Sequence, residues 1–509
     1  MSDQEQTHKD NALKKSVECE SFSIEESHGS QESLLFEKSM MAFKDQKIPL
    51  MGSLKEILFA SIPSMFGLVF QVLTEVSNLV FVGQYGGAKD LSGVGLGNML
   101  VNIIIFSIGM GMNGALDTLV SQSHGNKQYY LCGVYLNRAR IIQAILFVPG
   151  AILLLFTKQI LILFQQEEEA SEIARLYVCA MIPGLFAMTQ FETLRRYLQG
   201  MEIFHITMII QCSTMVLHFL WTYLLFVVLD MGILGVSIAT LITFWLNLLS
   251  ATLLLTYKKG IVHEQSWSFF NKDSFAGWGQ YIRYGIPATC MLCLEWWAFE
   301  VLEIFAGMVS VDVLAAHVIF QNFLYFLFQI PFGIGFASAN LIGNCLGDCN
   351  PSKARKYFHS ALLLIFMITT VIDILIFTFR SSLSRIYTQE DSVNIIVRDT
   401  TPVVVVMVML DFPQGVLAGV LRGIGSQDFG SFVTLVGYWI FSLPGAVILT
   451  FVFDLQLKGI WGGIQIGTLV CFSSFLYRCL TANWTQLSKD AVKRIHDEKL
   501  KLIEGTNSK

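Results

Sequence analysis

The sequence carries little charge for its length. Only 14% of its 509 residues are charged, whereas 53% are hydrophobic and the mean hydropathy is +0.57. A soluble protein of this composition would have too few polar side chains to cover its surface. We conclude that a lipid bilayer forms part of its surroundings and that the chain is a membrane protein.

An excess of basic residues is also absent. The chain has 34 Lys and Arg residues against 39 Asp and Glu residues, and a net charge of -5. The basic residues form no continuous stripe that could follow a phosphate backbone. Nucleic acid is therefore not an expected partner.

Cysteine pairs and catalytic motifs are missing as well. Most of the ten cysteines lie within apolar stretches, where a thiol packs as a small hydrophobic group, so we expect no disulfide framework. Cys290 and Cys293 have the spacing of a redox pair, but no second pair completes a metal site. No nucleophile elbow accompanies Asp117, His124 or His317. We expect neither an enzyme nor a bound metal or cofactor.

Long apolar segments are abundant. Twelve of them have roughly 20 residues, enough to cross about 30 Å of hydrocarbon. We expect these spans to begin near Leu54, Gly93, Ala139, Ile173, Ile203, Gly232, Tyr281, Val313, Ser360, Ile396, Gly430 and Gly459.

The loops on one side of these spans contain most of the basic residues, which predicts that this side and both termini are cytoplasmic. The residues counted there are Lys127, Arg138, Arg140, Arg195, Arg196, Lys258, Lys259, Lys272, Arg283, Lys353, Arg355, Lys356 and Arg422.

The two halves of the sequence resemble each other. Four landmarks recur in the same order at offsets of 222 to 227 residues, which is typical of an internal duplication. The pairs are Pro63 with Pro287, Gly125 with Gly347, Arg196 with Arg422, and Gly232 with Gly459.

We therefore expect an all-α polytopic membrane protein with 12 transmembrane helices in two parallel six-helix bundles. A pseudo-two-fold axis along the membrane normal would relate the bundles, with a cavity between them. The expected parts are a disordered cytoplasmic tail (1–50), an N-terminal bundle (51–258), a cytoplasmic linker (259–280), a C-terminal bundle (281–487) and a cytoplasmic tail (488–509). The last tail is expected to form a short amphipathic helix, on the membrane or free in the cytosol. A duplicated body suits alternating access and so favours a transporter.

Four motifs carry a family resemblance. Gly114-Ala-Leu-Asp-Thr-Leu-Val-Ser-Gln-Ser-His-Gly125 resembles the signature after the second span of eukaryotic multidrug and toxic compound extrusion (MATE) proteins. Leu294-Glu-Trp-Trp-Ala-Phe-Glu300 is similar to the Glu-Trp-Trp-x-x-Glu of their seventh span. The other two are Val82-Gly-Gln-Tyr-Gly86 and Gly419-Val-Leu-Arg-Gly423 with Gly425 and Gln427. The resemblance extends from Leu54 to about Leu487. It implies a secondary antiporter that exports organic cations or xenobiotics in exchange for protons.

Carboxylates within spans are candidate coupling sites, because each costs about 2.5 to 3.5 kcal/mol to insert. Glu295, Glu300 and Glu303 share an arc of about 140° on the seventh span. No Lys or Arg occurs between Tyr284 and Gly307 to neutralise them, so desolvation favours their protonated forms. A proton and a cationic substrate are then expected to compete for one site.

The resemblance implies roles for three of these carboxylates. Glu295 and Glu300 match the motif glutamates implicated in substrate and proton binding, and Asp411 stands where members place a further functional carboxylate. Asn78 stands where bacterial members have an aspartate, and an amide cannot release a proton, so coupling is assigned mainly to the second half. The remaining candidates are Gln321 and Asn322 as amides that orient substrate, Trp296 and Tyr325 for cation–π contact, and Gln71 and Glu75 in the N-terminal bundle.

Several alternatives stay open. Na⁺ can replace H⁺ as the coupling ion, because a carboxylate with nearby amides holds either. The substrate can be an organic anion or secondary metabolite. A lipid-linked oligosaccharide flippase shares the architecture, although such relatives rely on a cationic cavity. We expect a monomer in the plasma or vacuolar membrane.

Overall fold

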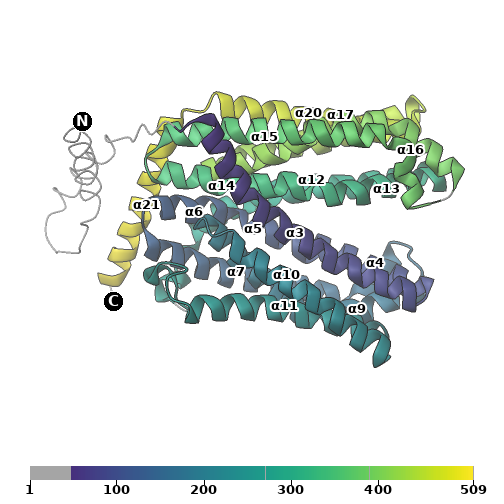
Figure 1. The fold of residues 1–509 in the computed structure, drawn as a ribbon, viewed down its shortest axis with the longest axis horizontal. Coiled ribbons are helices and arrows are strands. Elements are labelled where there is room, and N and C mark those ends of the chain that lie inside the picture. The colour runs from purple at the N-terminus through teal and green to yellow at the C-terminus, as the bar shows by residue number, and fades with distance from the viewer. Residues whose placement is uncertain (1–47, 270, 389, 508–509) are drawn as a thin grey trace, which may run out of the picture. The chain divides into compact units, whose positions relative to one another are not determined.

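The computed structural model describes residues 48–507, apart from 270 and 389. The predicted N-terminal tail (1–50) therefore lies almost entirely outside the described residues. Within the described part every element is a helix and none is a strand (Figure 1).

The N-terminal half contains six spans, each a helix or a run of consecutive helices. They are α3 (Leu50–Tyr85); α4 (Ala88–Val101), η1 (Asn102–Phe106), α5 (Ser107–Met112) and α6 (Gly114–Gly125); α7 (Tyr129–Leu155); α9 (Glu168–Gly200); α10 (His205–Thr222) and η2 (Tyr223–Val228); and α11 (Gly232–Tyr257). The short α8 (Thr157–Leu163) precedes α9, and two 3₁₀ turns, η3 (Glu264–Ser266) and η4 (Lys272–Phe275), lie between the halves.

The C-terminal half repeats this plan. Its spans are α12 (Trp278–Val309); α13 (Val311–Leu327) and α14 (Gln329–Gly347); α15 (Pro351–Thr378); α17 (Asp391–Ile424); α18 (Gln427–Thr434), η6 (Leu435–Ser442), α19 (Leu443–Val447) and η7 (Ile448–Val452); and α20 (Gln456–Leu480). The short α16 (Arg380–Leu383) and η5 (Ser384–Ile386) precede α17, and α21 (Trp484–Asn507) ends the described chain.

The twelve predicted spans correspond to these twelve helical runs. Within the described residues, eleven runs are long and apolar enough to cross a membrane. The twelfth is α12, whose 32 residues suffice in length but include Glu295, Glu300 and Glu303, which lower its hydropathy. The span that departs most from the apolar pattern is therefore the one that carries most of the candidate carboxylates.

The two bundles pack closely at one end. There α6 packs against α14 and α17, and α14 also packs along α3. The two motif glycines that are repeat mates make equivalent contacts: Gly125 lies against the backbone of Asn344, and Gly347 lies against the backbone of Gln122. Since no side chain would fit at either position, these glycines allow α6 and α14 to meet backbone to backbone. We call this end of the protein the closed end.

Several arginines do not lie in loops as predicted. Arg138 lies in α7, Arg195 and Arg196 lie in α9, and all three are at most 2% exposed. Arg422 lies in the last turn of α17 and is also buried. Counting these residues as loop charges was wrong, because they are partners in buried ion pairs.

The C-terminal helix does not project free into solvent. α21 packs against α14 and α15 of one bundle and against α6 of the other, at the closed end (Figure 1). Its Glu498 forms an ion pair of 2.6 Å with Arg138 of α7, and both side chains are at most 4% exposed. Its Arg494 donates to Gln122 Oε1 at 2.6 Å and also to the Tyr284 hydroxyl of α12. The helix therefore bridges the two bundles.

Candidate functional site

A buried pair of carboxylates lies within the C-terminal bundle. Glu295 of α12 is 8% exposed and Asp411 of α17 is 3% exposed, and the two interact electrostatically. Tyr438 of η6 donates to Glu295 Oε1 at 3.2 Å, and Gln414 Nε2 donates to Glu295 Oε2 at 3.4 Å. Asp411 Oδ1 has no hydrogen-bond partner among the described residues. The sequence thus predicted two members of this cluster, and the structure places them together.

The neighbours of this pair are neutral hydrogen-bonding groups. Tyr438 also lies 3.4 Å from Gln414 Oε1 and 3.5 Å from the Thr468 hydroxyl of α20. Among the described residues no Lys, Arg or His donates a hydrogen bond to Glu295 or Asp411. Two carboxylates this deeply buried disfavour simultaneous ionisation, so the arrangement suits a site that gains and loses a proton or a cation.

The other two glutamates of α12 lie apart from this pair. Glu300 and Glu303 are partly buried and interact with each other, one helical turn apart. They lie further along α12, away from the closed end and toward α13. The predicted group of three carboxylates therefore divides into a deep member, Glu295, and two shallower members.

A charged cluster joins the bundles near the closed end. Asp117 of α6 is fully buried and accepts from Arg196 of its own bundle at 3.3 Å and from Arg422 of the other bundle at 3.2 Å. The ring of Phe336 stacks below both guanidinium groups, 3.3 Å and 5.3 Å from their central carbons. Arg196 and Arg422 are repeat mates, so one carboxylate receives the equivalent arginines of both halves.

Three predicted residues of the N-terminal bundle follow one face of α3, and two of them share Tyr177 of α9 as a neighbour. The Asn78 amide donates to the Tyr177 hydroxyl at 3.4 Å, and Glu75 lies close enough for electrostatic interaction with it. Asn78 donates to Thr240 at 2.9 Å and lies 3.0 Å from His218 Nε2, so both ends of its amide are held. Glu75 lies close enough to Tyr325 of α13 for electrostatic interaction. The structure brings Glu75 and Asn78 together at Tyr177, whereas Gln71 faces a separate pocket.

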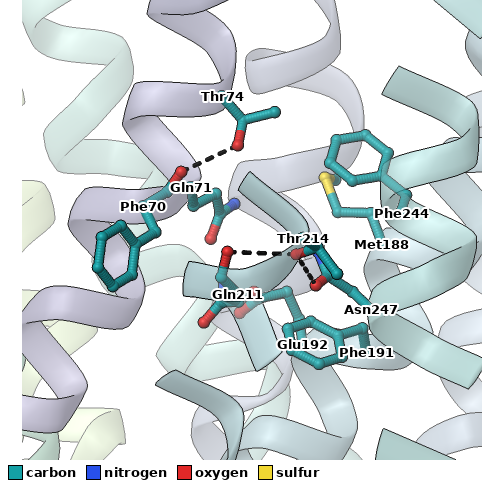
Figure 2. A pocket seen from close by; sticks show the side chains of 10 residues that line it. All are labelled: Phe70, Gln71, Thr74, Met188, Phe191, Glu192, Gln211, Thr214, Phe244 and Asn247. Atoms are coloured by element: carbon teal, nitrogen blue, oxygen red, sulfur yellow. Dashed lines mark hydrogen bonds between the residues drawn. The ribbon is translucent and has the colours of Figure 1, made fainter. Parts of the chain in front are cut away.

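Gln71 faces a small pocket inside the N-terminal bundle (Figure 2). Its volume is about 20 Å³, which is room for roughly one water molecule. Neither polar atom of the Gln71 amide has a hydrogen-bond partner among the described residues, and the same holds for Gln211 Oε1. Glu192 also lines the pocket and is paired with Arg195 at 2.5 Å. This pocket is too small for an organic substrate in the present conformation.

The remaining candidate residues of the C-terminal bundle do not lie together. Trp296 stacks against Phe106 of the N-terminal bundle, with ring centroids 6.0 Å apart, and so faces the interface between the bundles. Asn322 is exposed and donates to the Val318 carbonyl at 3.0 Å. Gln321 is partly buried. Within the described residues no hydrogen bond joins either amide to Glu295.

Comparison with known proteins supports the predicted family. The MatE family model matches residues 63–224 and again residues 287–448, and therefore covers more than half of the chain in two consecutive copies. The chain belongs to the MATE family. The two matches begin at Pro63 and Pro287, the first pair of predicted landmarks, and confirm the internal duplication.

Curated MATE relatives come from animals and plants. The chain is 30% identical to the multidrug and toxin extrusion protein 2 of Mus musculus over 83% of this chain and 73% of that protein. It is 29% identical to the protein DETOXIFICATION 9 of Arabidopsis thaliana over 88% of this chain and 92% of that protein. The family is one of transporters and not of enzymes.

Solved MATE structures share the fold. The crystal structure of the eukaryotic MATE transporter AtDTX14 superposes with a TM-score of 0.82 and 26% sequence identity, covering 88% of this chain and 99% of that one. A Vibrio cholerae MATE transporter, VcmN, gives a TM-score of 0.77 at 16% identity, covering 86% and 99%. The architecture of twelve helices in two bundles is thereby confirmed.

Several residues of the candidate site could not be predicted from the sequence. Tyr438 and Gln414 donate to Glu295, and Thr468 lies beside the Tyr438 hydroxyl, but none of the three carries a charge that would mark it within an apolar helix. Arg196 did carry a signal, because it has a repeat mate, Arg422, across the duplication. The sequence indicated a loop charge for Arg196 instead, and Asp117 was considered only as a member of a hydrolytic site.

Proposed function

We propose that this MATE protein is a secondary antiporter that exports organic cations or related xenobiotics in exchange for protons. The observation that carries the proposal is the Glu295–Asp411 pair, buried in the C-terminal bundle among neutral hydrogen-bonding groups. A buried carboxylate without a hydrogen-bonded basic partner binds a proton or a cation, but is costly to leave empty and ionised.

Substrate recognition would use the same chemistry. An organic cation entering between the bundles would meet the carboxylates of α12 and the aromatic rings of Trp296 and Phe332, whose centroids are 6.1 Å apart. Cations are attracted both to carboxylates and to aromatic faces. Competition between proton and cation for Glu295 would then produce exchange, because the site holds one or the other.

The proposal includes the orientation of the protein in the membrane. Exposed basic residues at the closed end include Lys127, Lys258 and Arg355, and we propose that this end faces the cytoplasm. In that orientation the bundles are sealed toward the cytoplasm, and the described part of the chain begins and ends on that side (Figure 1). We further propose that a monomer is sufficient for transport, because each chain contains both bundles.

The test is uptake of a fluorescent organic cation into proteoliposomes under an imposed pH gradient, with and without Na⁺. Proton exchange predicts accumulation that follows the pH gradient and collapses with a protonophore, whether or not Na⁺ is present. Accumulation that follows a Na⁺ gradient alone would assign Glu295 and its oxygen neighbours to Na⁺ instead. Absence of cation transport under either gradient, in protein that exchanges an organic anion, would overturn the substrate class.

A further inference from the structure

Arg422 lies between two acidic residues that belong to different bundles. Its Nε donates to Asp117 Oδ2 at 3.2 Å across the closed end. Gln414, about two helical turns before Arg422 on α17, donates to Glu295 Oε2 at 3.4 Å, so Glu295 is an acidic residue near Arg422 within the same bundle. Arg422 Nη2 is buried and has no hydrogen-bond partner among the described residues, so one donor of the guanidinium is available.

Like Arg422, Asp117 has an oppositely charged residue in its own bundle as well as one in the other bundle. Besides Arg422 it accepts from Arg196 Nη1, at 3.3 Å and 3.5 Å to its two oxygens. Each member of the ion pair that joins the bundles therefore has a second partner of opposite charge on its own side. For Asp117 this partner is Arg196, which is hydrogen-bonded to it already; for Arg422 it is Glu295, to which Arg422 forms neither a hydrogen bond nor an ion pair in this conformation.

We propose that Arg422 is a positioning residue that links the opening of the closed end to the protonation of Glu295. When the bundles separate at this end, Asp117 keeps Arg196 while Arg422 turns from Asp117 to Glu295. The inference rests on the proposed function and extends it, because it names the group through which the gate acts on the coupling carboxylate.

The physical reason is the cost of an unpaired buried charge. Breaking a buried ion pair is strongly unfavourable when either partner is left alone, and exchange of partners removes this cost. Arg422 can pair with Glu295 only if the carboxylate is ionised. The open form of this end therefore favours release of the proton, whereas in the closed form Asp117 satisfies Arg422 and Glu295 can remain protonated.

This direction agrees with proton-driven export. If the closed end is cytoplasmic, Glu295 takes up a proton while the site faces the opposite side and releases it when the gate opens to the cytoplasm. By linkage, the same coupling means that ionising Glu295 stabilises the open form. Raising the pH should therefore open this end.

The local structure connects the two sites through one helix. α17 carries Asp411 and Gln414 at the carboxylate pair and Arg422 at the interface. Beside Arg422, hydrogen bonds between neutral groups also join the bundles. Thr118 Oγ1 donates to the Arg422 carbonyl at 2.5 Å, and Gln122 Nε2 donates to the Gly423 carbonyl at 3.0 Å. These bonds carry no charge and exchange readily with water when the end opens.

Other titratable groups near this path are few. Those that face Glu295 are Asp411, Tyr438 and Cys471, and those that face Asp117 or Arg422 are Arg195, Arg196 and Tyr281. Side chains of arginine, tyrosine and cysteine ordinarily titrate above the neutral range, whereas carboxylates titrate below it unless they are buried. Glu295 and Asp411 are then the groups able to make the gate respond to pH, and Arg422 faces Glu295.

The experiment measures the gate directly. Spin labels on genetically encoded residues at Lys127 and Ser352, which are exposed at the closed end of the two bundles, report their separation in lipid nanodiscs. In the wild-type protein, the separated population should grow as the pH rises from about 5.5 to about 8.5, a range that brackets buried carboxylates. In Arg422→Gln that response should shrink by at least about fivefold, and Arg422→Lys should restore part of it. Glu295→Gln should remove it.

Arg478→Gln is the matched control, because Arg478 donates to Ser426 within the C-terminal bundle and should leave the response intact. A full wild-type response in Arg422→Gln, or a flat response in the wild type, would overturn the inference. If Arg422→Gln does not fold, a persisting pH response in Glu295→Gln would overturn it equally. Proteoliposome uptake on the same samples separates the two levels: pH-driven transport with an unaffected gate in Arg422→Gln refutes the role of Arg422 alone, whereas transport indifferent to pH refutes the proposed function.

Discussion

Replacing Glu498 by Gln tests whether α21 secures the closed end. The carboxylate of Glu498 lies 2.6 Å from Arg138 Nη1, with the two side chains 4% and 1% exposed. At an effective dielectric constant of about 20, this separation corresponds to about 6 kcal/mol of attraction, much of which offsets the desolvation of the two charges. Removing one partner of such a pair typically costs about 3–5 kcal/mol.

Glutamine keeps a hydrogen-bond acceptor for Arg138, which returns about 1 kcal/mol. Among the described residues Arg138 otherwise retains a hydrogen bond to the Asp273 carbonyl at 3.3 Å and the face of the Tyr135 ring at 5.7 Å. We therefore expect Glu498→Gln to lower the free energy of unfolding by about 2–4 kcal/mol, and the apparent melting temperature of a chain of this length by several degrees. The assay is thermal unfolding of purified protein in detergent at a fixed heating rate.

The adjacent Asp497 provides a matched control. It lies on the exposed face of α21, so Asp497→Asn removes the same charge without a buried partner and should change the melting temperature by about a degree or less. Equal melting temperatures for the two variants would refute the view that the buried pair holds α21 in place. A large loss in both would indicate a general effect of charge on this helix.

Three further predictions follow from the packing and the predicted topology. Asn78→Asp should leave transport largely active but lower stability by about 1–2 kcal/mol, because aspartate cannot donate to Thr240; complete loss of uptake in folded protein would move the coupling site into the N-terminal bundle. Gly347→Ala should prevent full closure of the closed end, measured as a larger spin-label separation there, whereas Gly95→Ala, which has open space around it, should not. Asn483, the asparagine of the Asn-Trp-Thr sequon, should carry no glycan in a eukaryotic host, and a glycosidase-sensitive mass shift at that residue would contradict the proposed topology.

The spans and the duplication could be predicted from the sequence because they depend on local composition and on recurring landmarks. Twelve apolar segments required no knowledge of how the helices pack, and the offset between Pro63 and Pro287 equals the offset between the two family matches. The pairing of Glu295 with Asp411 was only partly accessible. Each carboxylate was conspicuous in an apolar helix, but their proximity depends on how α12 and α17 are rotated against each other.

The contacts that uncharged side chains make with the carboxylates could not be predicted in the same way, nor could the ion pairs of the buried arginines. Tyr438 lies in an apolar run of η6, where the sequence does not indicate that its hydroxyl meets Glu295. Arg138 and Arg196 were counted as loop charges because hydropathy marks only the apolar part of a helix, and long helices extend beyond it. The position of α21 depends on Glu498 finding Arg138, which is 360 residues away in the sequence. Such long-range pairs leave no local pattern.

The central claim is that Glu295 is the carboxylate through which protons drive transport, and one measurement tests it most directly. Glu295→Gln and Glu303→Gln are reconstituted at equal amounts into proteoliposomes, and initial uptake of an organic cation is measured as a function of an imposed pH gradient. Glutamine keeps the hydrogen bonds to Tyr438 and Gln414 but cannot titrate, so the account predicts that Glu295→Gln folds and loses uptake driven by the pH gradient, while Glu303→Gln retains most of it. Uptake by Glu295→Gln at the wild-type rate with an unchanged pH dependence would contradict it.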